Sequence, residues 1–422
     1  MNTPGAGPRG PLGRLLQTRQ IRVLTQANFG LYTLGNGISL TGSWMQRVAL
    51  LWLVWQMTGS GFWLGIFATA DMLPILFVGP FAGVAADRWD RLKQTRFSQY
   101  VLATIAALYG VLLIAGQLHL GILLALTVAN GCFIAINQPA RMALVQNLVQ
   151  RADVGTAVAL SSVNVNLARI TGPAIAGIMM VHMPVAWVFL VNAALTLIFA
   201  TLLQMLRVAL EPARPRTGSV WSQIWEGVVF AFRDVGISRL LWLLFLGGAG
   251  VRAIQDMFPA IAERNFGAGS SGLAFLTSGM AVGAVIAGIT FGVSASLAPM
   301  ARRVALSWGL GALALAVLSV STSPWLDVAL VAVVGYAVTS GVIGTQTFVQ
   351  LRAPDLMRGR VLSVHGLISR GSPALGALAT GWAFDRVGPM PPILATAGLV
   401  IMSVIAVMIS LRGIPHIDTP QD

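Results

Sequence analysis

The stretch GPFAGVAADRWDRLK, residues 79–93, passes from small apolar residues into five charges. The charged residues are Asp87, Arg88, Asp90, Arg91 and Lys93. Apolar segments lie on either side of these charges, at 61–85 and 97–116. A helix of about 20 residues is long enough to cross the hydrocarbon core of a bilayer. The stretch therefore predicts a short charged turn between two membrane-spanning helices.

The composition supports the same reading for the whole chain. Of its 422 residues, 56% are hydrophobic and only 10% are charged, which leaves more apolar surface than a soluble core can bury. Long runs rich in Ala, Gly, Leu and Val favour helices over the short alternating segments of a membrane β-barrel. We therefore expect an all-α polytopic membrane protein. Its twelve predicted spans are 28–56, 61–85, 97–116, 119–139, 157–181, 185–207, 238–262, 272–296, 304–322, 325–349, 361–383 and 391–411.

The basic residues predict how these spans are oriented. Only Arg264 and Arg386 fall in loops on the side opposite the amino-terminal tail. Such an asymmetry follows the positive-inside rule. We therefore expect a multi-pass protein of the inner (plasma) membrane with both termini in the cytoplasm. The basic residues that give the net charge of +13 are distributed according to the membrane topology, so this charge does not indicate a nucleic-acid partner. The residues on the tail side are Arg88, Arg91, Lys93, Arg96, Arg141, Arg151, Arg207, Arg214, Arg216, Arg233, Arg239, Arg302, Arg303, Arg352, Arg358, Arg360 and Arg412.

The Pro-containing segment 211–219 separates six spans from six. Residues 221–232 carry apolar side chains at helical spacing, which predicts either a helix in the inner membrane interface or a helical lead-in to the seventh span. The expected organisation is a basic tail (1–24), a six-helix bundle (25–208), a linker (209–236), a second six-helix bundle (237–411) and a second tail (412–422).

An internal repeat indicates that the two bundles are related. Arg-Ala-Asp-Val at 151–154, followed by Thr-Gly-Pro-Ala at 171–174, resembles Arg-Ala-Pro-Asp-Leu at 352–356, followed by Gly-Ser-Pro-Ala at 371–374. Both pairs of segments occupy the same place in the order of spans. Six spans plus six related spans is a repeat of the kind described for transporters.

Residues 83–93, GVAADRWDRLK, resemble the loop signature of the major facilitator superfamily, Gly-x-x-x-Asp-Arg-x-Gly-Arg-basic-basic. Asp90 stands where the general pattern has Gly, and Leu92 replaces a basic residue. The Asp-Arg-x-Asp-Arg form and the segment Asn164–Pro173 resemble the branch of enterobactin exporters and macrolide efflux proteins. The resemblance implies two six-helix bundles that work by alternating access.

The resemblance also implies a cytoplasmic latch built by the loop from Gly83 to Lys93. In it, Asp87 would lie near the amino end of the eleventh helix, where the helix dipole favours an anion. Arg88 and Arg91 would pair across the bundle interface. The alternative is that these charges, with Asp90 and Lys93, only set the topology of the turn.

Six charges lie inside predicted spans, where an unpaired charge is costly and is a functional candidate by default. They are Arg47, Asp71, Arg169, Arg252, Asp256 and Arg370. Four are positive and two are negative, which favours an anionic or amphipathic small-molecule substrate. Asn164 and Asn166 add polar groups to the substrate pathway, although such residues more often make helix-packing hydrogen bonds.

Spacing predicts two ion pairs. Arg47 and Asp71 lie at similar distances from the turn at residues 58–60, roughly 18 Å along an antiparallel hairpin at 1.5 Å per residue. Arg252 and Asp256 are four residues apart on one helix face, where they either pair directly or both face the cavity. Both pairs alternatively serve only as structural staples.

The energy source is predicted to be a proton gradient, because no Gly-x-x-x-x-Gly-Lys-Ser/Thr loop for ATP occurs. Asp71 and Asp256 are the candidate proton carriers, and we expect Asp71 to be the more sensitive because Asp256 lies nearer the outer surface. With one cysteine and four scattered histidines, the sequence predicts no metal site, cofactor or catalytic residue. We expect a monomeric, proton-coupled exporter of a small molecule such as a siderophore or drug. The alternative is a facilitator that imports or flips a lipid-like substrate.

Overall fold

The computed structural model describes residues 19–88, 90–206, 220–266, 269–290 and 297–412. Side chains are described in these ranges except at 19, 76, 80–88, 220–224, 265–266, 297–298, 355–356 and 412. These parts of the chain form helices joined by short turns, which confirms the predicted all-α fold.

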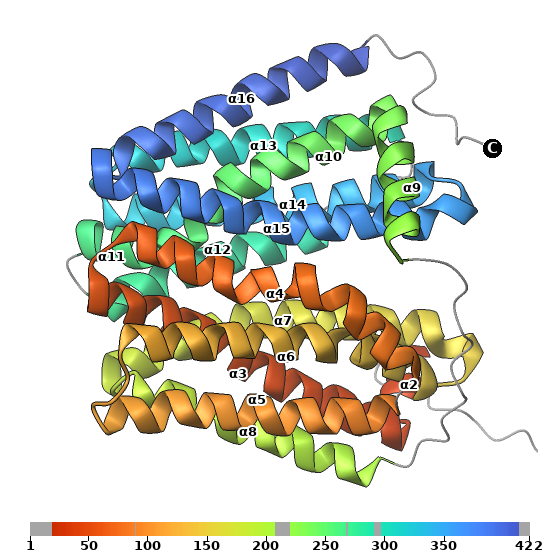
Figure 1. The fold of residues 1–422 in the computed structure, drawn as a ribbon. Helices are drawn as coiled ribbons and strands as arrows, with labels where there is room; N and C mark the ends of the chain where they lie inside the picture. Colours follow the sequence, from red (N-terminus) through yellow and green to blue (C-terminus); the bar gives the residue numbers. More distant parts are fainter. Residues whose placement is uncertain (1–18, 89, 207–219, 267–268, 291–296, 413–422) are drawn as a thin grey trace, which may run out of the picture.

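The helices form two groups that lie side by side (Figure 1). The first half contains α2 (Arg19–Leu24), α3 (Ala27–Thr58), α4 (Gly61–Arg88), α5 (Arg91–Ile114), α6 (Leu120–Asn147), the short 3₁₀ helix η1 (Arg151–Asp153), α7 (Val154–His182) and α8 (Ala186–Met205). The second half contains α9 (Val220–Arg233), α10 (Val235–Gly247), η2 (Gly248–Arg252), η3 (Ala253–Met257), α11 (Phe258–Phe266), α12 (Ser270–Thr290), α13 (Leu297–Val320), α14 (Pro324–Arg352), α15 (Asp355–Val387) and α16 (Met390–Arg412).

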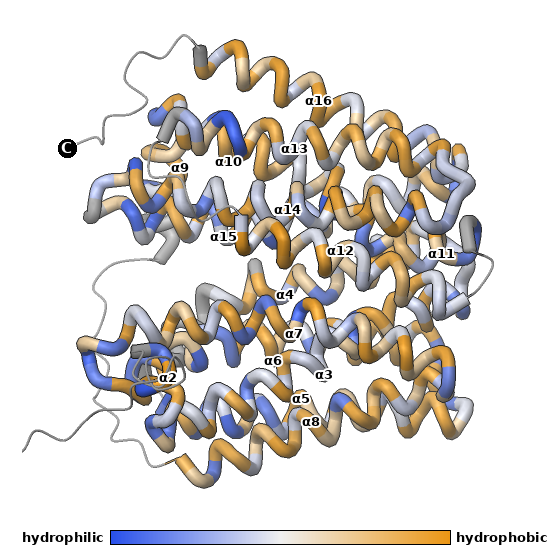
Figure 2. Tube along the Cα trace, turned by 180° about the vertical axis from the view of Figure 1, so that it is seen from behind, coloured by the Kyte–Doolittle hydropathy of each residue, from blue (hydrophilic) through white to orange (hydrophobic). Residues whose placement is uncertain are grey.

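Nine helical segments in the described ranges are long and apolar enough to cross a membrane. The other long helices, α3, α7 and α15, each carry one of the arginines predicted inside a span. Together they make the six-plus-six arrangement expected from the sequence. Hydrophobic residues run along all of the long helices, and hydrophilic residues gather at both ends of the molecule, for example around α2 and near α11 (Figure 2).

The two ends of the molecule differ in what they contain. We call the end where α2 begins and α16 ends the terminal end, and the opposite end, with the turn between α3 and α4, the far end (Figure 1). At the far end, Gly59 adopts a left-handed conformation with φ 58°, which closes α3 and confirms the predicted turn. At the terminal end, Asp90 caps α5, and its carboxylate accepts hydrogen bonds from the backbone N–H groups of Leu92 and Lys93.

The halves meet through two antiparallel helix pairs, α4 against α15 and α7 against α12. Glycines permit the close approach. A Cβ atom on Gly65 would lie 2.6 Å from the carbonyl oxygen of Ala377, and one on Gly61 would lie 3.0 Å from that of Gly381. Backbone therefore touches backbone where α4 begins and α15 ends.

The segment after the linker forms a helix of its own, α9, which ends before α10 begins. Asp234 separates the two helices and accepts a hydrogen bond from the backbone N–H of Ile237 at 2.8 Å. Trp225 and Phe232 on α9 are 68% and 73% exposed. These features fit an interfacial helix better than a continuous lead-in to the next span.

Candidate functional site

An arginine on α3 bridges two carboxylates from different halves of the molecule. Arg47 Nη1 lies 2.5 Å from Asp71 Oδ2 on α4, which is the ion pair expected from the hairpin. Arg47 Nη2 lies 3.0 Å from Asp256 Oδ1 on η3 of the second half. The side chains of Asp71 and Asp256 are 17% and 7% exposed. We call Arg47, Asp71 and Asp256 the bridging triad.

Of the two alternatives for Arg252 and Asp256, the direct pair is not formed, because Asp256 bonds to Arg47. The seventh span does not continue as an α-helix there, because η2 is a π-helix and η3 is a 3₁₀ helix. The four-residue spacing therefore no longer places the two side chains on one helix face, and Asp256 turns to Arg47 instead. Within the described residues, Arg252 has no hydrogen-bond or ion-pair partner.

Asp256, which was expected to lie nearer the outer surface, is not the more accessible of the two carboxylates. Asp256 is the more buried carboxylate of the two, at 7% exposed against 17%. A cavity of about 20 Å³ adjoins Arg47 and Asp256, with Trp44 and Thr277 in its wall. That volume holds about one water molecule.

The helix α7 brings a second arginine close to the bridging triad. Gly172 permits this approach, since a Cβ atom there would lie 2.7 Å from the carbonyl oxygen of Thr41 on α3. One turn earlier on α7, Arg169 lies over the Trp44 ring at 5.3 Å from the ring centroid, a cation–π contact. Its Nε is buried and has no hydrogen-bond partner among the described residues.

The four arginines form one electrostatic group. Arg370 Nη1 donates to Gln138 Oε1 at 3.1 Å, across the boundary between the halves. Arg47, Arg169, Arg252 and Arg370 lie close enough to repel one another. Against these four arginines stand two carboxylates, Asp71 and Asp256, so basic side chains outnumber acidic ones in this group.

The two asparagines predicted in the pathway differ in their surroundings. Asn164 Nδ2 donates to the carbonyl oxygen of Thr33 at 2.8 Å and so joins α7 to α3. Asn166 Nδ2 donates to the carbonyl oxygen of Ser162 one turn earlier on the same helix, at 2.9 Å, and Asn166 is exposed. Asn164 thus has a packing partner on another helix, whereas the described partner of Asn166 lies on its own helix.

The predicted latch is described only in part. The side chains of Gly83, Asp87 and Arg88 lie outside the described set. Arg91 Nη1 donates to Asn147 Oδ1 at 3.0 Å, a contact within the first half, because the start of α5 lies beside the end of α6. Among the described contacts, Arg91 therefore does not pair across the bundle interface as expected. Lys93 is exposed, and Asp90 serves as the helix cap described above.

The family described as transmembrane secretion effector, a branch of the major facilitator superfamily, matches residues 21–421. The chain belongs to this family. It is therefore a membrane transporter by family, and the resemblance seen in the loop from Gly83 to Lys93 is confirmed.

Curated relatives of this transporter include efflux proteins. The multidrug efflux pump Tap of Mycobacterium tuberculosis is 27% identical over 405 residues, which cover 91% of each chain. The enterobactin exporter EntS of Shigella boydii is 26% identical over 392 residues, which cover 91% of this chain and 92% of the relative.

Solved structures share the fold at low sequence identity. A bacterial homolog of the human lysosomal transporter Spinster superposes with a TM-score of 0.69 at 13% identity, covering 93% of this chain and 98% of that one. The nucleoside transporter NupG superposes with a TM-score of 0.68 at 13% identity, covering 92% and 99%. These structures support the twelve-helix fold of the superfamily.

Two residues of the site could not be recognised from the sequence. Trp44, which lies under Arg169, and Gln138, which accepts from Arg370, look like ordinary residues of apolar spans. Each of them lies on a different helix from the arginine that it contacts. Their only signal is tertiary proximity.

Proposed function

We propose that this transporter exports a small organic molecule in exchange for protons by alternating access. The observation that carries the proposal is the bridging triad, in which Arg47 of the first half holds one carboxylate of its own half and one of the other half. A proton on either carboxylate removes its charge and weakens its bond to Arg47. Protonation is thereby linked to an ion pair that joins the halves.

The charge of the site supports an anionic or amphipathic substrate. Arg169, Arg252 and Arg370 have no carboxylate partner among the described residues. An anion that enters between the halves would offset the net charge of this group. Efflux of drugs or a siderophore by the relatives agrees with such a substrate class.

The positions of the contacts support a state that is closed at the far end. Between described residues, hydrogen bonds across the halves run from the level of Arg370 to the far end and include Thr69 to Ala374 and Ser270 to Met180. The basic loops predict that the terminal end lies in the cytoplasm. Substrate would then enter from the cytoplasm in the state described.

The experiment uses inside-out vesicles that contain the full chain and a pH-sensitive dye. Enterobactin, a macrolide and a lysolipid are added in turn, and proton movement is followed together with uptake of the labelled compound. We expect compound-dependent proton release for an anionic or amphipathic compound and its loss in Asp71→Asn. Glu226→Gln, which neutralises an acid at the terminal end, serves as the control.

Two results would decide against proton-coupled export. Uptake of a compound without any proton movement would show that transport is not coupled to protons. Uptake of the lysolipid alone, independent of a gradient, would favour the alternative of a lipid facilitator.

A further inference from the structure

A carboxylate of the second half caps a helix of the first half at the far end. Asp385, in the last turn of α15, accepts hydrogen bonds from Ser60 Oγ at 2.5 Å and from the backbone N–H groups of Gly61 and Phe62 at 2.7 and 3.1 Å. The helix α4 begins at Gly61. The first N–H groups of a helix lack acceptors within the helix, and its amino end favours an anion.

This cap differs from the other aspartate caps in the described chain. Asp90 caps α5 and Asp234 caps α10, each from a position directly before the helix that it caps. Asp385 is 324 residues away from Gly61 along the chain. The N–H groups of Gly61 and Phe62 therefore have this acceptor only while the two halves are in contact, whereas Trp63 N–H donates to Ser60 Oγ of its own half.

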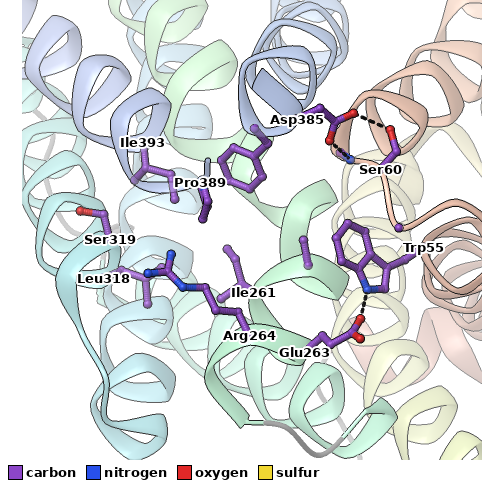
Figure 3. Close-up of a pocket in the computed structure, with 14 residues that line it drawn as sticks. Trp55, Ser60, Ile261, Glu263, Arg264, Leu318, Ser319, Asp385, Pro389 and Ile393 are labelled. Carbon is purple, nitrogen blue, oxygen red and sulfur yellow. Dashed lines mark hydrogen bonds between the residues drawn. The ribbon is translucent and has the colours of Figure 1, made fainter. Parts of the chain in front are cut away.

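The surrounding contacts make the cap sensitive to separation of the halves. Directly beneath it, the backbones of α4 and α15 touch at Gly61 and Gly381. Beside it, Trp55 Nε1 of the first half donates a hydrogen bond to Glu263 of the second half (Figure 3). Movement of α4 away from α15 at this level breaks the cap and exposes the N–H groups that it covers.

A cavity of about 530 Å³ lies next to these two contacts. It is partly open to solvent; the turn from Gly59 to Gly61 lines it on the side of the first half, and Arg264, Phe384 and Pro389 line it on the side of the second half, as the labelled Ser60, Arg264 and Pro389 show (Figure 3). The volume lies in the range of small-molecule pockets, about 300–1,000 Å³. Displacement of the α3–α4 turn would remove the wall of this cavity that the first half supplies.

The sequence contains the same motif at both ends of this helix pair. The helix α15 ends in Gly-Trp-Ala-Phe-Asp-Arg, residues 381–386, and α4 ends in Gly-Val-Ala-Ala-Asp-Arg, residues 83–88. Because the two helices are antiparallel, Asp87 stands at the level where α15 begins, as Asp385 stands where α4 begins. The two copies of the motif Gly-x-Ala-x-Asp-Arg thus lie at opposite ends of the α4–α15 pair.

We propose that Asp385 is the gating residue of the far end, and that release of its cap on α4 lets the two halves separate there. The proposal rests on the proposed alternating access but requires neither a particular substrate nor proton coupling. Asp385 is a positioning residue here, since it acts through α4 and not by contact with the transported molecule.

The proposal is tested by pulsed electron–electron double resonance, which measures distances between pairs of spin labels on the full-length protein in nanodiscs. In a Cys132→Ser background, labels at Met183 and Val320 report the far end, one in each half, and both positions are at least half exposed. A second pair at Met205 and Leu351 reports the terminal end. No substrate or gradient is added, so a failure of proton coupling does not affect the result.

We expect Asp385→Asn to raise the population with long far-end distances by about tenfold, because charge-assisted hydrogen bonds to two backbone N–H groups are weakened. The terminal-end distances should shorten in parallel. Asp385→Glu, which keeps the carboxylate, should recover part of the original distribution. Arg386→Gln is the matched control, because Arg386 stacks on Trp382 of its own helix at 4.4 Å and has no described partner in the other half.

An unchanged far-end distribution in a monodisperse Asp385→Asn protein would overturn the proposal. An equal shift in Arg386→Gln would also overturn it, because any change at the end of α15 would then suffice. If Asp385→Asn does not fold, Trp55→Phe provides the second variant. It removes the bond to Glu263 but keeps an aromatic ring, and an absent far-end shift in this variant would likewise count against a gate at this site.

Discussion

The first spanning segment of each half carries charges of the site, but the two segments differ in their helical continuity. In the first half, α3 runs unbroken through 32 residues and holds Arg47 on a regular helix. In the second half, the corresponding segment changes from α10 to the π-helix η2 and then to the 3₁₀ helix η3. A regular helix sets the position of Arg47, and a broken one brings Asp256 to it.

Because of this difference, we call Arg47 the fixed cation of the site and Asp256 its adjustable anion. π and 3₁₀ segments within a helix often mark functional sites, because they change the direction in which side chains point. The break leaves Arg252 without a described partner and gives Asp256 a partner in the other half. We infer that, when the two halves move, the broken segment changes its conformation more than α3 does.

Removing the fixed cation should have the largest effect. Arg47→Gln leaves Asp71 and Asp256 without their shared partner, and breaking a buried pair costs about 3–5 kcal/mol of unfolding free energy. Thermal unfolding in detergent measures the loss, and transport should be abolished. Adding Asp71→Asn should restore stability only in part and should not restore coupling, since Asp256 remains unpaired. Full recovery of both stability and transport in this double variant would show that Arg47 is only a staple between α3 and α4.

Removing the adjustable anion should have a smaller effect. Asp256→Asn leaves Arg47 bound to Asp71 and weakens one charge-assisted hydrogen bond, worth about 1.5–3 kcal/mol. Because Asp256 is the more buried carboxylate, its loss should reduce proton-driven transport at least as much as Asp71→Asn does. Parallel vesicle assays of both variants make the comparison. Proton-driven transport that survives both substitutions would rule out the coupling role of the triad.

Disturbing the packing behind the break tests whether its geometry matters. A Cβ atom on Gly376 of α15 would collide with the carbonyl group of Ala249 in η2, so Gly376→Ala should displace η2 at a cost of about 1–3 kcal/mol. Gly366→Ala on the same helix is the control, since nothing lies within 4 Å of its Cβ position. We expect weaker transport in the first variant only. Equal activity of the two would mean that the position of η2 does not set the site.

Removing the unpaired arginine should have the smallest effect on stability. Arg252→Gln deletes a buried charge that has no described carboxylate partner, so the free energy of unfolding should stay the same or rise. Binding of an anionic compound should weaken, whereas binding of a neutral compound should not. Calorimetric titration with a matched anionic and neutral pair measures this difference. A clear loss of stability would instead reveal a structural partner for Arg252.

The fold was predictable because its signals are local. Runs of apolar residues set the spans, Gly59 set the turn between α3 and α4, and the loop from Gly83 to Lys93 indicated the superfamily. The contact between Arg47 and Asp71 was also predictable, since one tight turn joins their helices and so sets their relative depth.

The contacts between the halves were not predictable from spacing. Arg47 and Asp256 are 209 residues apart, and nothing in a helical period relates side chains across that distance. The direct pair considered for Arg252 is absent because the four-residue rule assumes a regular α-helix, whereas this segment contains π and 3₁₀ turns that pack against α15. The repeated Gly-x-Ala-x-Asp-Arg motif was visible in the sequence, but its meaning at Asp385 required the helix that it caps.

The sequence by itself determined which residues enter the membrane, which charges are buried with them and how the first hairpin pairs them. These follow from hydrophobicity and helix geometry, which act over neighbouring residues. Only the tertiary structure decided that Arg47 bridges the two halves and that Asp385 caps α4. Those contacts depend on how the two bundles meet, and their energies come from groups that the chain brings together only when both bundles are packed.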